Sequence, residues 1–578
     1  MILHSLNDYY RRLQTEGLAD VATEGFQKQP IPFVVVLNRD GSFLGLVDTR
    51  SGEGKEKSAR QFTVPKGVKK TSGIAANLLW DTPAYVFGRP KSDPKKDLSK
   101  LMQRAVEQQL CFLNTIRERL VPALEDEGIH ALLQFLGNDN FQAVFDHPAW
   151  PEIEESGAIL SFQLEGDICL ICERPAVVAA LMTAQLAEGS MQQTCLITGE
   201  PDEPARLHTA IKGVYGAQRS GANIVSFNLS AFTSYKKEQS FNAPVGKRAE
   251  FAYTTALNHL LSKGSMQRLQ VGDATTVFWA EKKHEIENVF GGLFGEQPRE
   301  PEQDYKQLIA AFRAPQTGAP PQLDPNTAFF VLGLAPNAAR IAVRFWYAGT
   351  VGDIAANIEQ HFDDIEIVRP PKQSRYLSLF RLLVATAALG KAENILPNLA
   401  GEFMKSILIG TPYPQALLGA VIRRCRSERE ITYPRASLVK AVLSREARYY
   451  KKTVKEVGMS LDTGNNNVGY RLGRLFATLE KIQEEASPGI NATIRDRFYG
   501  AASSTPVSAF PHLMKLKNHH LGKLESRGRA VNLEKLIGEI MDGLNEFPAH
   551  LSMADQGRFA VGYYHQRQTF FTSTRKDQ

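Results

Sequence analysis

The chain has 578 residues, and its 68 lysines and arginines against 62 aspartates and glutamates give a formal net charge of +6. This length exceeds what one hydrophobic core supports and predicts two or three domains. The charge is too small to indicate a nucleic-acid-binding protein by itself, so local clusters of charge carry that argument. Five scattered cysteines argue against a disulfide framework and for a reducing cytoplasm.

The N-terminal residues 1–13 predict an amphipathic helix that carries Arg11 and Arg12. They lack the apolar core and the cleavage site of a signal peptide. The best apolar run, residues 377–389, is interrupted by Arg381 and does not reach membrane-spanning length. We therefore expect a soluble cytoplasmic protein with no membrane partner.

A hairpin is predicted near the start, because the apolar runs 31–36 and 42–47 flank the turn residues Asn38-Arg39-Asp40-Gly41. The next segment, residues 49–81, reads TRSGEGKEKSARQFTVPKGVKKTSGIAANLLWD and places two clusters of cations around a short β-like run. Cations beside glycine and small hydroxyl residues suit a phosphate backbone, and an asparagine at the loop edge suits a base edge.

We take seven residues of this loop as candidate DNA contacts: Arg60, Lys66, Lys69, Lys70, Thr71, Ser72 and Asn77. The alternative is a solvated loop whose lysines only keep the surface soluble.

The middle of the chain alternates in character. Helical periodicity covers residues 101–136, strand character follows at 159–172, and a helix is expected at 177–186. Further strands are predicted at 224–227 and 275–279, so this part is mixed α/β.

The loop GVYGAQRSGANIVS, residues 213–226, is punctuated by glycines and holds Gln218, Arg219 and Ser220. Its glycines do not have the G-x-G-x-x-G spacing of a dinucleotide site. The loop is a candidate for insertion at a strand fork or for clamping a displaced single strand. A tight structural turn is the alternative, because glycine commonly serves that purpose.

The C-terminal third is predicted to be helical. A surface linker is expected at residues 296–325, two strands at 329–334 and 341–346, and helices beyond about residue 376. The clearest apolar stripe is formed by Val468, Leu472, Leu475, Leu479 and Ile482. The fold class is therefore α+β. A mixed α/β N-terminal region presents the basic loop on a small sheet, and a helical bundle follows, with boundaries near 1–100, 101–375 and 376–578.

Residues 421–456 form the most basic stretch. On a helix, Arg445, Arg448 and Lys452 share a face, with Tyr449 and Tyr450 between them. Such a surface would neutralise phosphates without reading sequence, whereas the alternative is a solvated helical face. The candidate backbone contacts, two of them in the following helix, are Arg423, Arg424, Arg445, Arg448, Lys451, Lys452, Lys455, Arg471 and Arg474.

Sequence motifs of catalysis are missing. There is no G-x-x-x-x-G-K-[ST], no H-E-x-x-H and no His-Asp dipeptide, so we expect a protein that is not an enzyme and needs no cofactor or metal. Two alternatives stay open. A nuclease site could use Asp363, Asp364 and Glu366, and a zinc site could use Cys169, Cys172, Cys195 and His208. A buried strand cysteine explains Cys169 more simply, because the second pair lacks zinc-ligand spacing.

Several blocks of sequence, in one order along nearly the whole chain, resemble a known family. They are VLNRDGSFLGLVDTR with VPKGVKKTSGIAANLLWD, TGEPDEPARLHTAIKGVYGAQRSGANIVSFN, SFNAPVGKRAEFAYTTALNHLL and VGDATTVFWAE. The chain is similar to the large subunit of the type I-C CRISPR surveillance complex (Cascade). One departure is Ala75, where the family pattern often carries a lysine, so one expected DNA cation is missing.

The resemblance implies a non-catalytic subunit that recognises the protospacer-adjacent motif (PAM) in double-stranded DNA and stabilises the R-loop. In RNA-guided systems base pairing reads most of the target, and protein reads a short flanking motif. The implied partners are guide RNA, target DNA with its displaced strand, backbone, guide-processing and small subunits, and a recruited helicase-nuclease. The family also implies that a small subunit can start inside this reading frame, for which Met459 and residues 459–578 are the candidate.

Overall fold

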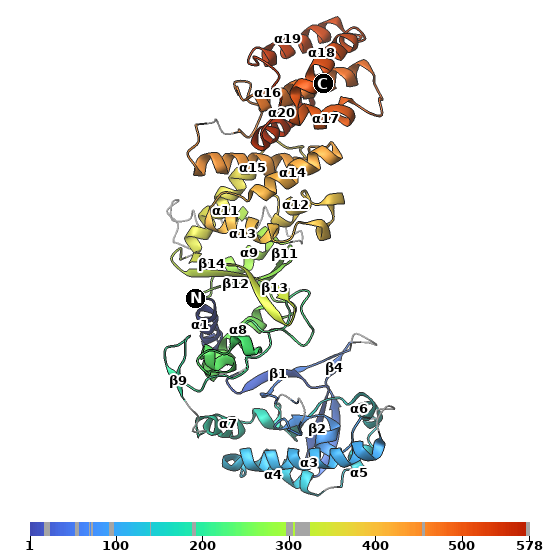
Figure 1. The fold of residues 1–578 in the computed structure, drawn as a ribbon. Coiled ribbons are helices and arrows are strands. Elements are labelled where there is room, and N and C mark those ends of the chain that lie inside the picture. Colours follow the sequence, from blue (N-terminus) through green and yellow to red (C-terminus); the bar gives the residue numbers. More distant parts are fainter. Residues whose placement is uncertain are drawn as a thin grey trace. The chain divides into compact units, whose positions relative to one another are not determined.

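The computed structural model describes residues 1–16, 23–52, 57–68, 70, 73–91, 97–138, 140–187, 192–295, 305–306, 324–453 and 457–573. They form two compact units (Figure 1). The larger unit comprises Met1–Tyr9, His208–Ser226 and Leu257–Gln578, and the smaller unit comprises Tyr10–Leu207 and Phe227–Ala256. Helices accompany small sheets in an N-terminal α/β region, and a helical stretch follows, so the predicted α+β class is confirmed. The division into three domains, at about residues 100 and 375, stays a prediction.

The smaller unit is built on a four-stranded mixed sheet in the order β3-β2-β8-β7. The predicted hairpin is confirmed, because β2 (Phe33–Leu37) and β3 (Phe43–Asp48) pair antiparallel around the Asn38–Gly41 turn. Strand β8 (Leu160–Leu164) lies parallel to β2, and the two-residue strand β7 (Trp80–Asp81) pairs antiparallel with β8. The apolar run Val34, Val35 and Leu37 is buried, as expected for a central strand.

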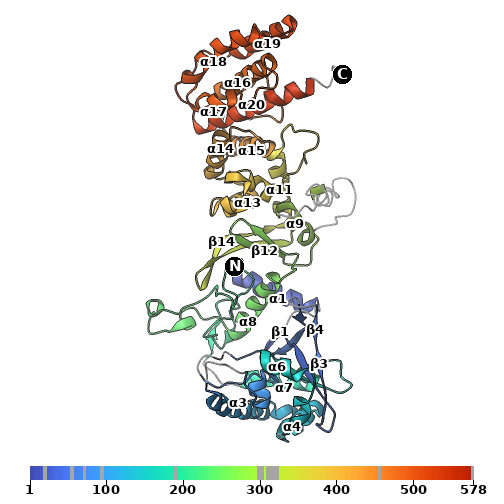
Figure 2. The same cartoon turned by 90° about the vertical axis from the view of Figure 1, so that its right-hand side faces the viewer.

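Helices α4 and α5 contact the strands of this sheet, and α3, α4, α6 and α7 lie near β3 in Figure 2. Bounds are α2 Pro83–Phe87, α3 Leu98–Arg119, α4 Glu127–Gly137, α5 Gln142–Phe145, α6 Trp150–Ser156 and α7 Pro175–Ala187. The helix predicted over residues 101–136 is two helices, since α3 ends before a 3-10 turn that contains Pro122, and Asp126 caps α4. The strand predicted to residue 172 ends at Leu164, where a turn with Gly166 at φ 85° follows.

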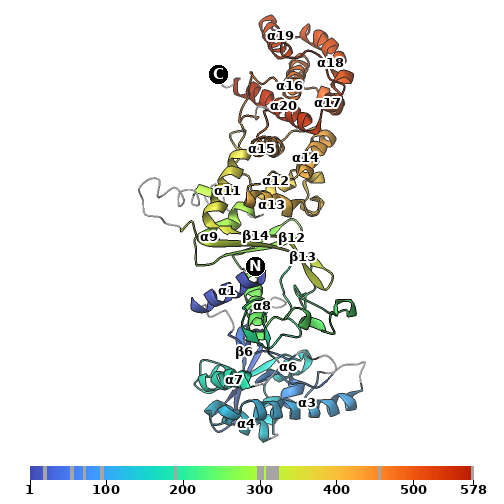
Figure 3. The same cartoon turned by 60° about the vertical axis from the view of Figure 1, so that its left-hand side comes forward.

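The larger unit contains an antiparallel sheet in the order β11-β12-β13-β14. Helices α9, α11 and α13 cover one of its faces (Figure 3), where Phe278 packs on Phe290 of α9 at 4.6 Å between ring centroids. Bounds are β11 Arg268–Val271, β12 Ala274–Ala280, α9 Ile286–Phe294, β13 Ala328–Asn337, β14 Arg340–Thr350, α11 Val351–Ile365, α12 Leu379–Val384 and α13 Leu399–Ile409.

The strand predicted at 224–227 is wrong. Only single bridges form just before it, at Ala222 and Asn223, because the glycine loop turns the chain there. The predicted linker at 296–325 lies almost wholly outside the described residues.

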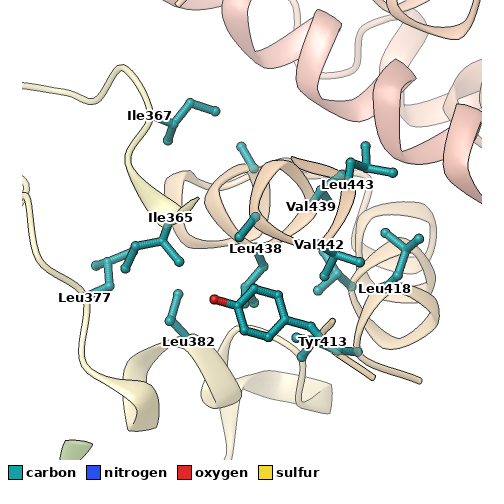
Figure 4. Packing of buried hydrophobic residues seen from close by; sticks show 14 of the residues in the cluster. Ile365, Ile367, Leu377, Leu382, Tyr413, Leu418, Leu438, Val439, Val442 and Leu443 are labelled. Atoms are coloured by element: carbon teal, nitrogen blue, oxygen red, sulfur yellow. The ribbon is translucent and has the colours of Figure 1, made fainter. Parts of the chain in front are cut away.

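Beyond about residue 376 the larger unit is helical, as predicted. Buried side chains of α15 lie between α11, α12 and α14 (Figure 4), where Leu438, Val439 and Val442 are nearly inaccessible to solvent. Bounds are α14 Gln415–Glu428, α15 Tyr433–Tyr449, α16 Val468–Ala486, α17 Ile494–Ser504, α18 Pro506–Leu521, α19 Arg527–Met541 and α20 Met553–Ser573. No helix in the described part of the chain is long and apolar enough to cross a membrane.

Helices α16 and α20 approach each other closely because both carry glycine at the contact. A Cβ atom at Gly473 of α16 would lie 2.0 Å from the backbone oxygen of Phe559, and one at Gly562 of α20 would lie 2.2 Å from that of Tyr470. The other side of α20 meets α14 and α15, since a Cβ at Gly557 would lie 3.0 Å from Val439. Helix α20 is therefore packed on two sides.

Candidate nucleic-acid interface

The basic loop of the smaller unit begins where a two-stranded ladder ends. Strand β1 (Phe26–Pro30) pairs antiparallel with β6 (Gln61–Pro65), and the Lys66 amide donates to the Gly25 oxygen at 2.7 Å. The Trp80 indole donates to the Pro65 oxygen at 2.8 Å and lies beside Gly67, where a Cβ would come 3.0 Å from the ring. The loop that leaves β6 therefore returns to β7 over a packed base, and its stem is fixed.

Asp81 is the centre of this stem. Its carboxylate is 1% exposed and accepts hydrogen bonds from the amides of Asn77 at 2.9 Å and Thr82 at 2.8 Å. The Lys70 ammonium donates to both carboxylate oxygens at 2.7 and 2.6 Å and lies 3.6 Å from the centroid of the Tyr85 ring. Burial raises the pKa of Asp81 above its usual value, while the hydrogen bonds from Lys70 and Asn77 lower it in part. The ion pair with the buried Asp81 therefore keeps the Lys70 ammonium away from other anions.

Asn77 does not project from the loop. Only 6% of the residue is exposed, and its Oδ1 accepts a hydrogen bond from the Val68 amide at 2.9 Å. The expectation of an exposed base reader at the loop edge is corrected, because in this structure the Asn77 carboxamide holds the loop in shape. A buried side chain of this kind affects recognition by positioning the exposed residues around it.

Two loop cations face solvent. Arg60 is exposed, with its guanidinium carbon 5.0 Å from the centroid of Phe62. The Lys66 side chain is 42% exposed and lies 3.4 Å from Glu250. Three further candidates, Lys69, Thr71 and Ser72, lie outside the described residues. The described residues around β6 therefore offer Arg60 and the partly exposed Lys66 to a phosphate, although Lys66 shares its charge with Glu250 and Lys70 is available only if it leaves Asp81.

The second candidate loop belongs to the larger unit. Gln218, Arg219 and Ser220 are exposed at its tip, between Gly216 and Gly221 at φ 76° and 94°. Its base is anchored, since Ile211 and Ala222 form a bridge and the Tyr215 amide donates to Thr275 Oγ1 at 2.9 Å. The loop is thus both a tight turn and an exposed polar tip. A nucleic-acid contact by Gln218, Arg219 and Ser220 stays a prediction.

In the basic stretch 421–456, one of the predicted phosphate contacts is buried. Arg445 of α15 is 1% exposed, its Nε donates to Asp364 Oδ2 at 2.6 Å, and its guanidinium lies 4.2 Å from the Tyr413 ring centroid. Arg448 donates to both oxygens of the same carboxylate at 2.8 and 3.0 Å. Arg445 as an exposed phosphate contact is wrong, because the bundle needs its charge to neutralise the buried Asp364.

Two arginines of α16 are also buried. Arg471 donates to backbone oxygens of Asn465, Glu539 and Ile540 at 3.0 to 3.2 Å. Arg474, at 1% exposed, donates to Gln566 Oε1 at 3.2 Å, and burial lowers its pKa. The prediction that Arg471 and Arg474 contact nucleic acid at the surface is corrected. Both side chains are buried and donate hydrogen bonds to groups inside the bundle, among them backbone oxygens near helix ends.

Several candidate cations of residues 421–456 lie on the surface, but some of them are paired with acids. Arg423 and Lys451 are exposed, Arg424 is half-buried 3.6 Å from Glu428, and Lys452 pairs with Glu446. Lys455 lies outside the described residues. A continuous basic face on α15 is therefore not present among the described residues, and Arg423 with Lys451 are the remaining candidates.

A metal-dependent site finds no support in the part of the chain that is described, where no group of three His, Cys, Asp or Glu side chains could hold a metal ion. Asp364, one candidate nuclease ligand, is engaged by two arginines. Of the proposed zinc ligands, Cys172 is buried, which raises its pKa and keeps the thiol protonated.

Sequence reasoning missed that Asp81 and Asp364 pair with the predicted cations, although it named Asp364 as a candidate nuclease ligand. Neither lies at helical spacing from its partner, since Asp364 and Arg445 are 81 residues apart. Asp81 lies at the end of a two-residue strand, a signal too short to recognise without the sheet.

With this geometry in place, comparison with known proteins adds an independent finding. Residues 6–571 match the model of the family described as CRISPR-associated protein (Cas_Csd1). No curated protein matches the chain.

Proposed function

Because the chain belongs to the CRISPR-associated Cas_Csd1 family, we propose that it is the large subunit of a type I-C surveillance complex, which recognises the PAM in double-stranded DNA and stabilises the R-loop. The family match over residues 6–571 carries the proposal, since it spans both units. The partners are guide RNA, target DNA, the backbone, guide-processing and small subunits, and a recruited helicase-nuclease. The protein acts in the cytoplasm and contributes no catalytic centre of its own.

The physical support lies in the smaller unit. Arg60 and Lys66 flank strand β6, which pairs with β1, and Lys70 forms an ion pair with the buried Asp81. Side chains that flank a hydrogen-bonded ladder meet a DNA backbone from a fixed position, which favours affinity. In this arrangement Arg60 and Lys66 contact phosphates, and Asn77 acts on discrimination by shaping the loop.

The test is equilibrium binding of the reconstituted complex to matched duplexes that differ only in the flanking motif. Wild type should prefer one motif, and Arg60→Ala or Lys66→Ala should weaken all duplexes and lower the salt slope by about one unit per lost contact. Asn77→Ala should reduce discrimination together with increased proteolysis of the loop. A wild-type complex that binds all flanking motifs equally would contradict the proposal, as would Mg²⁺- or Mn²⁺-dependent cleavage by the purified chain.

An internal start at Met459 is part of the same proposal. Residues 468–573 include five helices with a shared core, in which Phe476 packs on Tyr499, Phe559 and Tyr563 at 5.8 to 6.1 Å between ring centroids. A product that starts at Met459 would contain all five helices. Intact-mass analysis of the assembled complex tests this. A short C-terminal species should disappear when the upstream ribosome-binding sequence is changed silently, and full-length chain alone in an active complex would contradict it.

A further inference from the structure

A two-residue hairpin in the smaller unit has a backbone that its sequence does not favour. Ser234 and Lys237 form an antiparallel bridge, and the Lys237 amide donates to the Ser234 oxygen at 2.8 Å. The two residues between them, Tyr235 and Lys236, have φ of 49° and 60°. This is the type I′ geometry that selects Asn-Gly, because a Cβ atom is strained at positive φ. Tyr-Lys therefore costs stability at this turn.

The surrounding segment holds this turn in place. The Asn242 Nδ2 donates to the oxygens of Lys237 at 2.8 Å and Gln239 at 2.9 Å, and its Oδ1 accepts from the Ser234 amide at 3.1 Å. Asn242 thereby ties both hairpin arms to the 3-10 turn Gln239–Asn242. The strained conformation is built by several hydrogen bonds, so it is a property of the fold and not of a free loop.

The residues at the tip are directed to solvent. Tyr235 is 96% exposed, and both Lys236 and Lys237 are exposed. Neither lysine forms an ion pair with a described residue, and the adjacent acid is Glu238. Packing cannot explain an aromatic ring that contacts almost nothing, and turn chemistry would favour smaller residues. An exposed ring next to cations is the arrangement that binds unpaired nucleotides, in which a base stacks on the ring and phosphates meet the ammonium groups.

We propose that the tip formed by Tyr235, Lys236 and Lys237 binds an unpaired nucleotide of the target DNA, with the Tyr235 ring stacked on the base. This inference rests on the proposed function, since it requires that the complex opens a duplex.

The hairpin shares its support with the basic loop. Helix α8 (Lys247–Leu260, green in Figure 2) begins shortly after the hairpin, and its Glu250 pairs with Lys66 at 3.4 Å. Pro204 and Gly246 form a bridge just before this helix, which fixes the end of the hairpin segment. Tip and loop are thus attached to one helix start within the smaller unit, as two contacts on one DNA would require.

The experiment uses the reconstituted complex and a matched target that carries 5-iodouracil at single positions of the region that becomes unpaired. Ultraviolet cross-linking and peptide mapping then compare wild type with Tyr235→Phe, Tyr235→Ala and the double variant Tyr235→Asn with Lys236→Gly. Wild type and Tyr235→Phe should cross-link through the tip peptide. Tyr235→Ala and the Asn-Gly variant should lose that product and bind the opened target about fivefold more weakly or worse.

The Asn-Gly variant is also the folding control. It relieves the backbone strain, so its Tm should equal or exceed that of wild type while cross-linking is lost. Equal cross-linking and affinity for all four proteins would overturn the inference and leave the proposed function intact, provided that wild type opens the matched target. Cross-links from the tip to a protein subunit would overturn it too. A wild-type complex that binds no matched DNA would overturn both.

Discussion

The two basic stretches of this protein have opposite structural roles. Around strand β6, Arg60 just before it and Lys66 just after it reach solvent, with Lys66 3.4 Å from Glu250, and one buried carboxylate, Asp81, restrains Lys70. In α15 the most central cation, Arg445, is buried against Asp364. Both stretches look alike as runs of charge. The difference shows that a run of charge does not reveal which of its cations the fold has already neutralised with a buried anion.

Removing Arg445 should have the largest effect and would test this contrast most directly. Arg445→Ala leaves Asp364 buried with one fewer partner, so the larger unit should lose about 3–5 kcal/mol of unfolding free energy. The matched control is Arg423→Ala on α14, an exposed cation whose loss should cost less than about 0.5 kcal/mol. Urea unfolding measures both. An Arg445→Ala protein with wild-type stability and weakened DNA binding would reverse our assignment of the two stretches.

The second largest effect is expected from acid, which should lower the stability of the helical part. Buried histidines occur there, whereas residues 57–81 contain no histidine. Burial lowers the pKa of His565 to about 4, and its Nδ1 lies 2.9 Å from the Tyr470 hydroxyl. The unfolded chain takes up this proton below about pH 6.5, so stability is lost as pH falls through that value. Between pH 7.5 and 5 the loss from His565 should be about 2 kcal/mol.

The check for this pH effect is urea unfolding at both pH values with His565→Gln, which cannot titrate, as the comparison. His361, buried against Tyr413 with its pKa lowered well below the usual value by burial and by Arg445, adds in the same direction. A His565→Gln protein with the same pH dependence as wild type would show that this histidine does not contribute.

Asp81→Asn should have a smaller effect on stability and a visible one on the loop. The carboxamide keeps one acceptor oxygen, so one of the two backbone amides that donate to Asp81 loses its acceptor, and the charged hydrogen bonds to Lys70 are lost too, at a cost of about 1–2 kcal/mol. Lys70 would become free for phosphate while the loop loosens. Hydrogen exchange of residues 66–81 should rise, and the salt slope of DNA binding should steepen by up to about one unit. Unchanged exchange would mean that the pair does not hold the loop.

The smallest energetic effect is expected for single surface cations. Arg60→Ala should leave the unfolding free energy within about 0.5 kcal/mol of wild type and lower the salt slope by about one unit. Lys451→Ala, on the helical side, serves as the comparison and should lower the slope by less, because its neighbours Arg448 and Lys452 are already paired with Asp364 and Glu446. Equal slopes for both variants would mean that the two surfaces contribute alike.

Much of the fold followed from local pattern. The Asn38–Gly41 turn, the apolar runs of β2 and β12 and the stripe on α16 appear where periodicity predicts them. The site was predicted less well, because burial of a cation depends on partners distant in sequence. Nothing near Arg474 indicates that Gln566 will meet it, and the exposed neighbours of Arg445 in sequence, Tyr449 and Tyr450, suggested a surface. The hairpin at Tyr235 was missed because its sequence contradicts its turn.

Helix α20 has a consequence for how part of this chain could exist alone. Its Gly562 side faces α16, which any product starting at Met459 would keep, but its Gly557 side faces Leu418, Val439 and Leu443, which that product would lack. The Tyr564 hydroxyl would also lose its acceptor, the Val368 oxygen at 2.8 Å. Such a fragment would expose an apolar surface of α20 to solvent. Its newly bared apolar stripe should drive self-association or precipitation at high concentration, unless another subunit covers the stripe as soon as it is made.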